Sequence, residues 1–176
     1  MAEFYFAGVD VGSLSTDVSI IDDSGKVLSE IVIPTSVNGS EAAEAAFDSA
    51  LKLTNLSRDG ITAITATGYG RASVAFATGK TTEISCHGVG AHQLFPKTGT
   101  VIDIGGQDSK VIQIDSRGRM LDFTMNDKCA AGTGRFLEVM ANRLELDLDE
   151  LSSSKNIQGE SAPISSTCTV FAESEV

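Results

Sequence analysis

Two short segments place an aspartate and glycine at the end of a run of β-branched residues. The first holds Asp10, Gly12 and Ser13. The second holds Asp103, Gly105, Gly106, Gln107 and Asp108. Glycine removes side-chain bulk and permits positive φ, so backbone N–H groups in such a turn can face an anion. A neighbouring carboxylate suits Mg²⁺, which binds carboxylate and phosphate oxygens. Both segments therefore predict phosphate binding, with Asp10 and Asp103 at the magnesium ion.

The two segments belong to an internal repeat. Residues 9–28 (VDVGSLSTDVSIIDDSGKVL) align without a gap with residues 102–121 (IDIGGQDSKVIQIDSRGRML) at an offset of 93, and seven of 20 positions are identical. Each copy alternates strand-forming runs with a glycine turn and an Asp-x-x-Gly turn, which predicts a β-meander. Two duplicated hairpins without a chemical role are the alternative. The aspartate and glycine kept in both copies favour phosphate binding.

Two of the three cysteines precede predicted helices. Cys129 lies before a helix at 134–146, and Cys168 lies before a helix at 169–176. A helix N-terminus lowers the pKa of a thiol and favours an anionic cluster. An iron–sulfur cubane normally takes four thiolates, so these cysteines would suffice only in a two-fold dimer with the cluster on the axis. The alternative for each is a small buried residue.

The third cysteine, Cys86, lies beside His87 and near His92. No C-x-x-C or H-E-x-x-H pattern accompanies these residues, so a structural role is predicted in place of a zinc site.

The elements between the meanders predict an α/β protein of two lobes, 1–90 and 91–176, with a nucleotide cleft between them. The second lobe carries Cys129 and Cys168. The chain stops inside its last predicted helix, which indicates a C-terminally incomplete second lobe. A serine-rich loop is expected at 152–166. The other predicted elements are a helix at 41–53 capped by Ser40, a strand at 61–67, a helix at 85–94 and a short helix at 147–153.

Composition excludes several classes of protein. The 176 residues include 24 acidic and 13 basic side chains, giving a net charge of -11. Nucleic-acid binding is not expected, because phosphate backbones are held by clustered lysines and arginines. No apolar run is long enough to span a membrane. The N-terminus lacks the basic n-region of a signal peptide, so none is expected. Three widely spaced cysteines indicate reduced thiols and a cytoplasmic protein.

Six motifs resemble those of the activator (component A) of 2-hydroxyacyl-CoA dehydratases and of the related ATPase subunits of benzoyl-CoA reductase. The resemblance runs through the whole chain. The motifs are GVDVGS (8–13), ATGYGR (66–71), ISCH (84–87), VIDIGGQDSK (101–110), MNDKCAAGTGRF (125–136) and SSTCTVFAESEV (165–176).

The resemblance implies an actin-like ATPase (ribonuclease H-like) fold and a homodimer with one bridging 4Fe–4S cluster. Cys129 and Cys168 match the cluster cysteines. ATP hydrolysis to ADP would be coupled to passing one low-potential electron to a 2-hydroxyacyl-CoA dehydratase, with ferredoxin or flavodoxin as the donor. An ATPase subunit of a benzoyl-CoA reductase is the alternative within this resemblance.

The resemblance also assigns roles within the two glycine segments. Asp10, Gly12 and Ser13 match the first phosphate site. Gln107 is a candidate for orienting the attacking water, and the alternative is a turn residue. The second phosphate site matches Asp103, Gly105, Gly106, Gln107 and Asp108.

Two features depart from the family pattern. Many relatives have lysine where this chain has Asp17, close to the first phosphate segment. Relatives also continue past residue 176 with a glycine-rich segment that contacts adenosine. Nucleotide binding by this chain alone is therefore expected to be weakened.

Two other functions remain open from the sequence. A sugar or acetate kinase of the same superfamily would need both hairpins but no cluster cysteines. A non-catalytic ATP-sensing module would bind nucleotide without redox activity.

Overall fold

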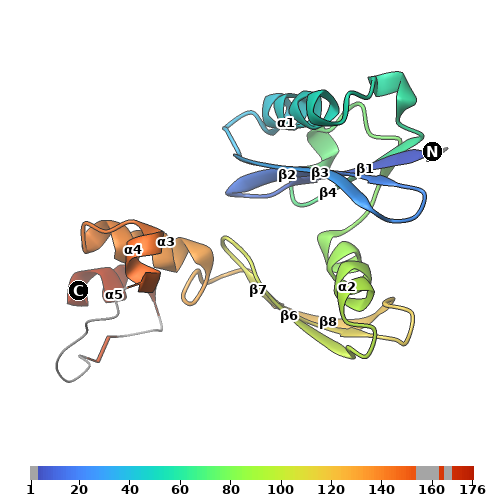
Figure 1. Ribbon diagram of the computed structural model, residues 1–176. Coiled ribbons are helices and arrows are strands. Elements are labelled where there is room, and N and C mark those ends of the chain that lie inside the picture. Colours follow the sequence, from blue (N-terminus) through green and yellow to red (C-terminus); the bar gives the residue numbers. More distant parts are fainter. Residues whose placement is uncertain (1–3, 154–162, 165–167) are drawn as a thin grey trace. The chain divides into compact units, whose positions relative to one another are not determined.

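The computed structural model describes residues 4–153, 163–164 and 168–176 (Figure 1). The chain divides into two compact units, Met1–Phe95 and Pro96–Val176. The boundary predicted at 90/91 lies inside a helix, Glu83–Leu94, and that assignment of lobes stays a prediction. Most of the expected serine-rich loop lies outside the described residues. Within the described part of the chain, no helix combines the length and apolar character needed to cross a bilayer.

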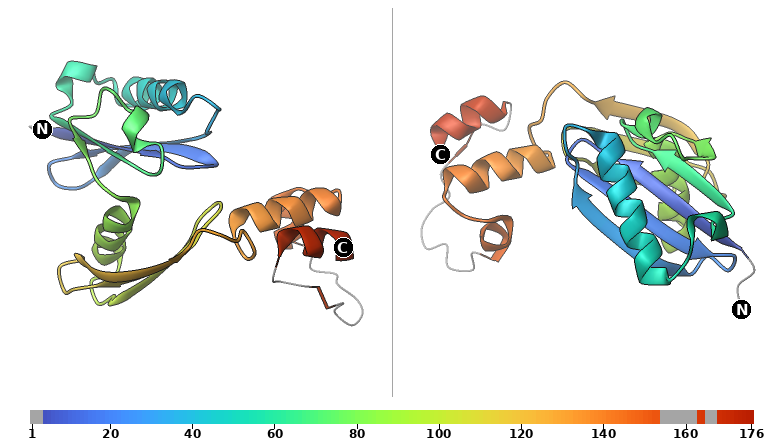
Figure 2. Two further views of the ribbon diagram at one scale, coloured as in Figure 1. Left: turned by 180° about the vertical axis from the view of Figure 1, so that it is seen from behind. Right: turned by 90° about the horizontal axis from the view of Figure 1, so that it is seen from above.

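The first unit is a five-stranded sheet with helices. The strand order is β3-β2-β1-β4-β5, in which β1 is antiparallel to β2 and parallel to β4. The helix α1 connects β3 to β4 and crosses one face of the sheet (Figure 2, right). The elements are β1 (Tyr5–Val11), β2 (Ser15–Asp22), β3 (Val27–Pro34), α1 (Gly39–Thr54), η1 (Arg58–Gly60), β4 (Ala63–Thr67), η2 (Arg71–Ser73), β5 (Gly79–Lys80) and α2 (Glu83–Leu94).

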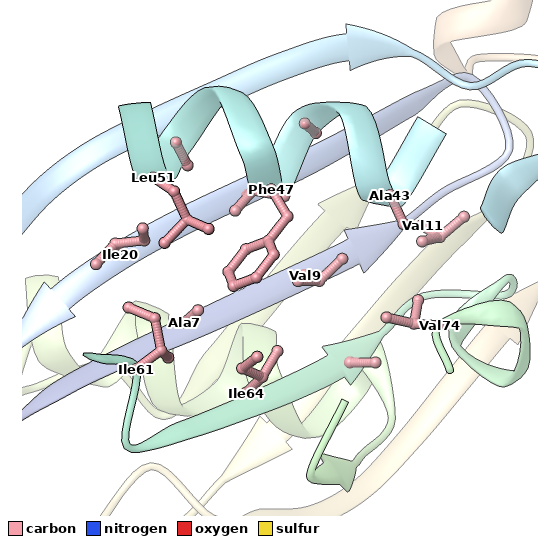
Figure 3. Close-up of a cluster of buried hydrophobic side chains, with 14 residues drawn as sticks. Ala7, Val9, Val11, Ile20, Ala43, Phe47, Leu51, Ile61, Ile64 and Val74 are labelled. Carbon is pink, nitrogen blue, oxygen red and sulfur yellow. The ribbon is translucent and has the colours of Figure 1, made fainter. Parts of the chain in front are cut away.

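The core of this unit lies between the sheet and α1. Because strand side chains alternate between faces, Val9 and Val11 of β1 point toward α1 while Asp10 points to the other face. Phe47 of α1 is fully buried above β1 (Figure 3). Its ring stacks on Phe76 with a centroid distance of 5.0 Å. This packing fixes the carboxyl end of β1, where Asp10 lies.

The start of α1 differs from the prediction. The helix begins at Gly39 with Asn38 as the N-cap residue, so the prediction that Ser40 caps it is wrong. The Asn38 side-chain amide donates to the Glu41 carboxylate at 2.7 Å and thereby orders the first turn.

The second unit contains a three-stranded antiparallel sheet, β6-β7-β8, and three helices. The helix α3 packs against both α4 and α5. The elements are β6 (Thr100–Ile104), β7 (Ser109–Ile114), β8 (Met120–Asn126), α3 (Gly134–Arg143), α4 (Leu148–Ser153) and α5 (Thr169–Glu175).

The repeat read from the sequence is a structural repeat with the same offset of 93 residues. Both copies form a three-stranded meander, β1-β2-β3 and β6-β7-β8, and both have a register shift at the equivalent place, after Ile20 and after Gln113. The Asp-x-x-Gly turns also match, because Gly25 has φ 81° and Gly118 has φ 74°. The predicted pair of meanders is confirmed.

Candidate functional site

Two glycine turns are built by the same hydrogen bond. Residues 12–15 form the first turn, in which the Gly12 N–H donates to the Ser15 carbonyl at 2.9 Å. Residues 105–108 form the second turn, in which the Gly105 N–H donates to the Asp108 carbonyl at 2.9 Å. A Cβ on Gly12 would lie 2.9 Å from the Ser15 carbonyl oxygen, and one on Gly105 would lie 2.5 Å from Asp108 Oδ1. Both turns therefore require glycine for space.

The glycines of the two turns do not adopt the positive φ that glycine permits. Positive φ is found at Gly25, Gly68, Gly118 and Gly132 but not in either turn. The first N–H of each turn is also used within the turn itself, so it does not face an anion.

The N–H groups that follow are available. Those of Ser13 and Leu14 in the first turn, and of Gly106 and Gln107 in the second, donate to no group in the described part of the chain. Consecutive open N–H groups form a concave site that favours an anion. Each turn therefore offers two donors to phosphate oxygens.

Asp10 lies in a row of polar residues at the carboxyl ends of β1 and β4. It pairs in register with Asp17 of β2 on one side and with Thr67 of β4 on the other. A Cβ on Gly68 would clash with Asp10 Oδ1 and would lie 2.5 Å from the Val11 carbonyl oxygen. The loop 68–70 is thus held directly against the Asp10 carboxylate, and only glycine permits that approach.

A thiol on α2 lies beside the same row. The half-buried Cys86 is close enough to Thr67 and Asp10 to respond to both. Burial raises the pKa of the Cys86 thiol, the Thr67 hydroxyl opposes that effect, and the negative charges of Asp10 and Glu83 add to it. The thiol therefore stays protonated and unreactive at neutral pH.

In the second turn, a buried lysine joins the predicted carboxylates. The Lys110 ammonium donates to Asp108 Oδ2 at 2.8 Å and to Asp103 Oδ2 at 3.3 Å, and only 3% of its side chain is exposed. Burial alone would lower the pKa of Lys110. The hydrogen bond to Asp108 and the charges of Asp108 and Asp103 outweigh burial and hold that pKa above its ordinary value.

The cysteines predicted to hold a cluster both lie in the second unit. Cys168 is the N-cap residue of α5, whereas Cys129 lies five residues before α3, in a loop of small residues that ends at Thr133. Both thiols are half-buried, so solvent or a second chain can reach them. Two reachable thiols near helix N-termini fit half of a four-thiolate cluster.

The Cys129 loop is connected to the second turn through α3. The Gly134 N–H donates to the Gly105 carbonyl at 3.0 Å, and the Arg135 N–H donates to the Gly106 carbonyl at 2.9 Å. These donors belong to the first turn of α3, whose N–H groups have no partner within the helix. The start of α3 is thus fixed to the peptide groups of the second turn.

The structure groups most of the predicted residues. It brings Asp10, Gly12 and Ser13 together at the first turn, and it brings the five predicted residues from Asp103 to Asp108 together at the second turn. Sequence reasoning assigned Cys86 a structural role but missed the parts that Gly68 and Lys110 take in the site. The signal for Lys110 was present, because it occupies the repeat position equivalent to Asp17.

Sequence reasoning also missed a polar pocket of about 520 Å³ in the second unit, along α3 and α5. Two arginines and two glutamates are among its lining residues, which are Arg135, Val139, Asn142, Arg143, Glu145 and Glu173.

Comparison with known proteins gives concordant results. The activator of lactoyl-CoA dehydratase from Anaerotignum propionicum is 48% identical over 172 residues, covering 98% of this chain and 66% of the relative. The crystal structure of the (R)-2-hydroxyglutaryl-CoA dehydratase component A from Acidaminococcus fermentans matches with a TM-score of 0.90 at 42% identity, covering 98% of this chain and 66% of that one.

A second solved structure matches equally well. The activator of the 2-hydroxyisocaproyl-CoA dehydratase from Clostridium difficile, with bound ADPNP, matches with a TM-score of 0.90 at 42% identity. The match covers 98% of this chain and 64% of that one. The chain thus spans just under two thirds of the length of these relatives. The expected actin-like ATPase fold is confirmed.

A family model adds the last observation. The model of the BadF/BadG/BcrA/BcrD ATPase family matches residues 7–176, which include both turns and both predicted cluster cysteines. The chain therefore belongs to the BadF/BadG/BcrA/BcrD ATPase family.

Proposed function

We propose that this protein is an ATP-hydrolysing iron–sulfur activator that passes a low-potential electron to a 2-hydroxyacyl-CoA dehydratase. Three of its relatives are named as activators or components of such dehydratases, and one of them binds ADPNP. The family-level ATPase assignment supports nucleotide hydrolysis.

The observation that carries the proposal is the attachment of α3 to the second turn. An activator must let the state of its nucleotide change the surroundings of its redox group. The two hydrogen bonds from Gly134 and Arg135 to the turn carbonyls connect the turn that we propose binds phosphate to the start of α3, which follows the Cys129 loop. If the second turn shifts between nucleotide states, the start of α3 would move with it. The bound nucleotide would thereby favour one conformation of the Cys129 loop over another.

The two turns would bind phosphate oxygens through their open N–H groups. Asp10 and Asp103 would hold Mg²⁺, directly or through water, because this ion is usually bound by one or two carboxylates together with the phosphates of the substrate. The Lys110 ammonium orients the Asp103 carboxylate and offsets its charge. Gln107 is exposed in the second turn, from which it would orient the attacking water.

Cys129 and Cys168 would each contribute a thiolate to a 4Fe–4S cluster shared with a second copy of the chain. The bound cluster would supply reversible one-electron transfer at low potential. The active species is then a cytoplasmic homodimer, with ferredoxin or flavodoxin as its electron donor.

Iron analysis tests the cluster. After strictly anaerobic reconstitution we expect about four iron and four sulfide ions per dimer, as a cubane requires. Cys129→Ala should lose this iron, whereas the matched variant Cys86→Ala should keep it, because Cys86 belongs to the other unit. A Cys129→Ala variant with full iron content would disprove the assignment.

Nucleotide turnover tests the turns. Asp10→Asn and Asp103→Asn should each remove magnesium-dependent ATP hydrolysis, while the exposed Asp59→Asn should not. Unchanged hydrolysis in either turn variant would refute its proposed magnesium role.

A further inference from the structure

The first turn carries a charge problem that the second turn does not have. Asp10 and Asp17 lie directly opposite each other in β1 and β2. The Asp17 carboxylate accepts a hydrogen bond from Ser15 Oγ at 2.9 Å and forms no ion pair in the described part of the chain. Two like charges at opposite positions repel each other, and both repel a phosphate. Beyond the Mg²⁺ proposed at Asp10, a cationic side chain from another part of the unit would therefore strengthen phosphate binding here.

The candidate cations of the first unit are few. Residues 4–95 contain five lysines and arginines. Arg58 pairs with Glu44 and Asp48 on the side of α1, at 2.6 and 3.0 Å. Lys26 lies in the turn at the far end of β2, and Lys52 lies in the last turn of α1. Arg71 and Lys80 remain.

Arg71 is fixed to the loop that contacts Asp10. Its guanidinium donates to the Gly68 carbonyl at 2.7 Å, and Gly68 is the residue whose Cα lies against the Asp10 carboxylate. The Gly70 N–H donates to the Val11 carbonyl at 2.9 Å, which holds the same loop on β1. One residue, Gly68, therefore lies between the arginine and the aspartate of the first turn.

The Arg71 guanidinium is held in place by the Gly68 carbonyl and still has N–H donors for a ligand. Its contact with Glu83 is 3.5 Å, longer than a charge-assisted hydrogen bond, and 36% of the side chain is exposed. A guanidinium has five N–H donors in a planar fork that suits phosphate oxygens. By contrast, Lys80 of β5 donates to the Ala72 carbonyl at 3.1 Å, four residues beyond Gly68 and outside the loop 68–70.

We propose that Arg71 binds the nucleotide phosphate at the first turn, where its positive charge offsets the negative charge of Asp17. The inference rests on the proposed function, because it concerns the same nucleotide. It assigns Arg71 a binding role, whereas in the second turn Lys110 supplies the positive charge from within the repeat.

The test is the affinity of the whole 176-residue chain for magnesium–ADP, measured by calorimetry. Arg71→Gln should weaken binding about tenfold or more, because it removes a charge-assisted contact to phosphate. Arg71→Lys should lose less, since it keeps the charge. Lys80→Gln is the matched control, because it removes the other cation that donates to a carbonyl of the 68–73 segment, and it should change affinity less than about twofold. Circular dichroism would establish that each variant is folded.

A second variant separates charge from loop structure. Asp17→Lys places a lysine at the repeat position of Lys110, so Asp17→Lys combined with Arg71→Gln should regain most of the lost affinity. Equal effects of Arg71→Gln and Lys80→Gln, or no recovery in the double variant, would overturn the inference while leaving the proposed function intact. A wild-type chain that binds no magnesium–ADP even at millimolar concentration would overturn this inference, whereas the proposed function is tested separately by the iron analysis and by ATP hydrolysis.

Discussion

The two turns share a backbone but carry opposite charges at one equivalent position. In the strands that flank the first turn, Asp17 faces Asp10. In the strands that flank the second turn, Lys110 faces Asp103, 93 residues later in both cases. The hydrogen bonds of the turns and the register shifts in the following strands agree in both copies. The meander backbone therefore accommodates either charge at this position. The two copies differ in which other segments of the chain contact them.

The two turns are also supported differently. The loop 68–70 lies against Asp10 and Val11 at the end of β1, just before the first turn, where Gly68 and Gly70 permit a close backbone approach. The start of α3 lies against the second turn through two N–H donors. The first turn thus gains an arginine from its supporting loop, and the second gains a connection to the Cys129 loop.

The largest expected effect is at the buried lysine. Lys110→Met would leave Asp103 and Asp108 without their shared cation, which we expect to lower the free energy of unfolding by about 3–5 kcal/mol. The equivalent change in the first turn, Asp17→Asn, removes a repulsion and should not destabilise the chain. Urea denaturation of both variants at neutral pH measures the contrast. Similar losses in both would contradict the difference drawn between the turns.

The same pair has a defined pH dependence. The folded-state pKa of Lys110 lies above its ordinary value of 10.5. Its contribution to stability is therefore fully present below pH 10.5 and is lost as the pH rises through the raised pKa. The stability gap between wild type and Lys110→Met should accordingly narrow in that alkaline range.

The next effect tests the supporting elements. Gly68→Ala would place a Cβ against Asp10 and the Val11 carbonyl at a positive φ of 82°, and we expect a loss of about 2–4 kcal/mol. Gly134→Ala, at the contact of α3 with the second turn, meets nothing closer than 3.5 Å and should be tolerated. Gly8→Ala in β1 has open space and serves as a control for glycine replacement. Thermal unfolding of the three variants ranks them, and a neutral Gly68→Ala would show that the loop can move away.

Much of this architecture was readable from the sequence because its signals are local. The alternation of apolar residues and the Asp-x-x-Gly turns predicted both meanders, and Gly25 and Gly118 behave as such turns require. The features that sequence reasoning missed depend on contacts between distant segments. Gly68 meets Asp10 only because β4 pairs in parallel with β1 across a helical crossover. The register in which β1 pairs with β4 cannot be predicted from a local sequence pattern.

Two further local details could not be predicted from the sequence. Glycine permits positive φ at Gly12, but the residue is needed there for its missing Cβ. The burial of Lys110 was not predicted because lysine is rarely buried without partners. Its two partners become evident only when Asp103, Asp108 and Lys110 are placed on one face of the hairpin.

A smaller effect should be equal in both copies. Gly25→Ala and Gly118→Ala each force a side chain into positive φ at the Asp-x-x-Gly turn, at a cost of about 1 kcal/mol each. Chemical denaturation of the single variants would measure the two values. Unequal losses would show that the meanders differ in backbone strain as well as in charge.

The smallest effect concerns the carboxylates of these same turns. The backbone N–H of Arg119, then its guanidinium and the N–H of Arg117, lower the pKa of Asp115 to about 2. The equivalent Asp22 faces Lys26, and its pKa is lowered mainly by the Ser24 hydroxyl. Arg119→Lys should therefore raise the pKa of Asp115, because the guanidinium bond at 2.7 Å is lost while the backbone bonds remain.

Carboxyl chemical shifts measured by NMR near pH 3 decide this point. Wild-type Asp115 is then mostly ionised, and the Arg119→Lys variant should be more protonated. Because a depressed pKa stabilises the fold above the ordinary value of 3.8 and loses that effect as the pH falls toward about 2, the variant should lose it at a higher pH. An unchanged shift would mean that the backbone N–H groups alone set this pKa, and that the arginine and lysine of the two copies are interchangeable.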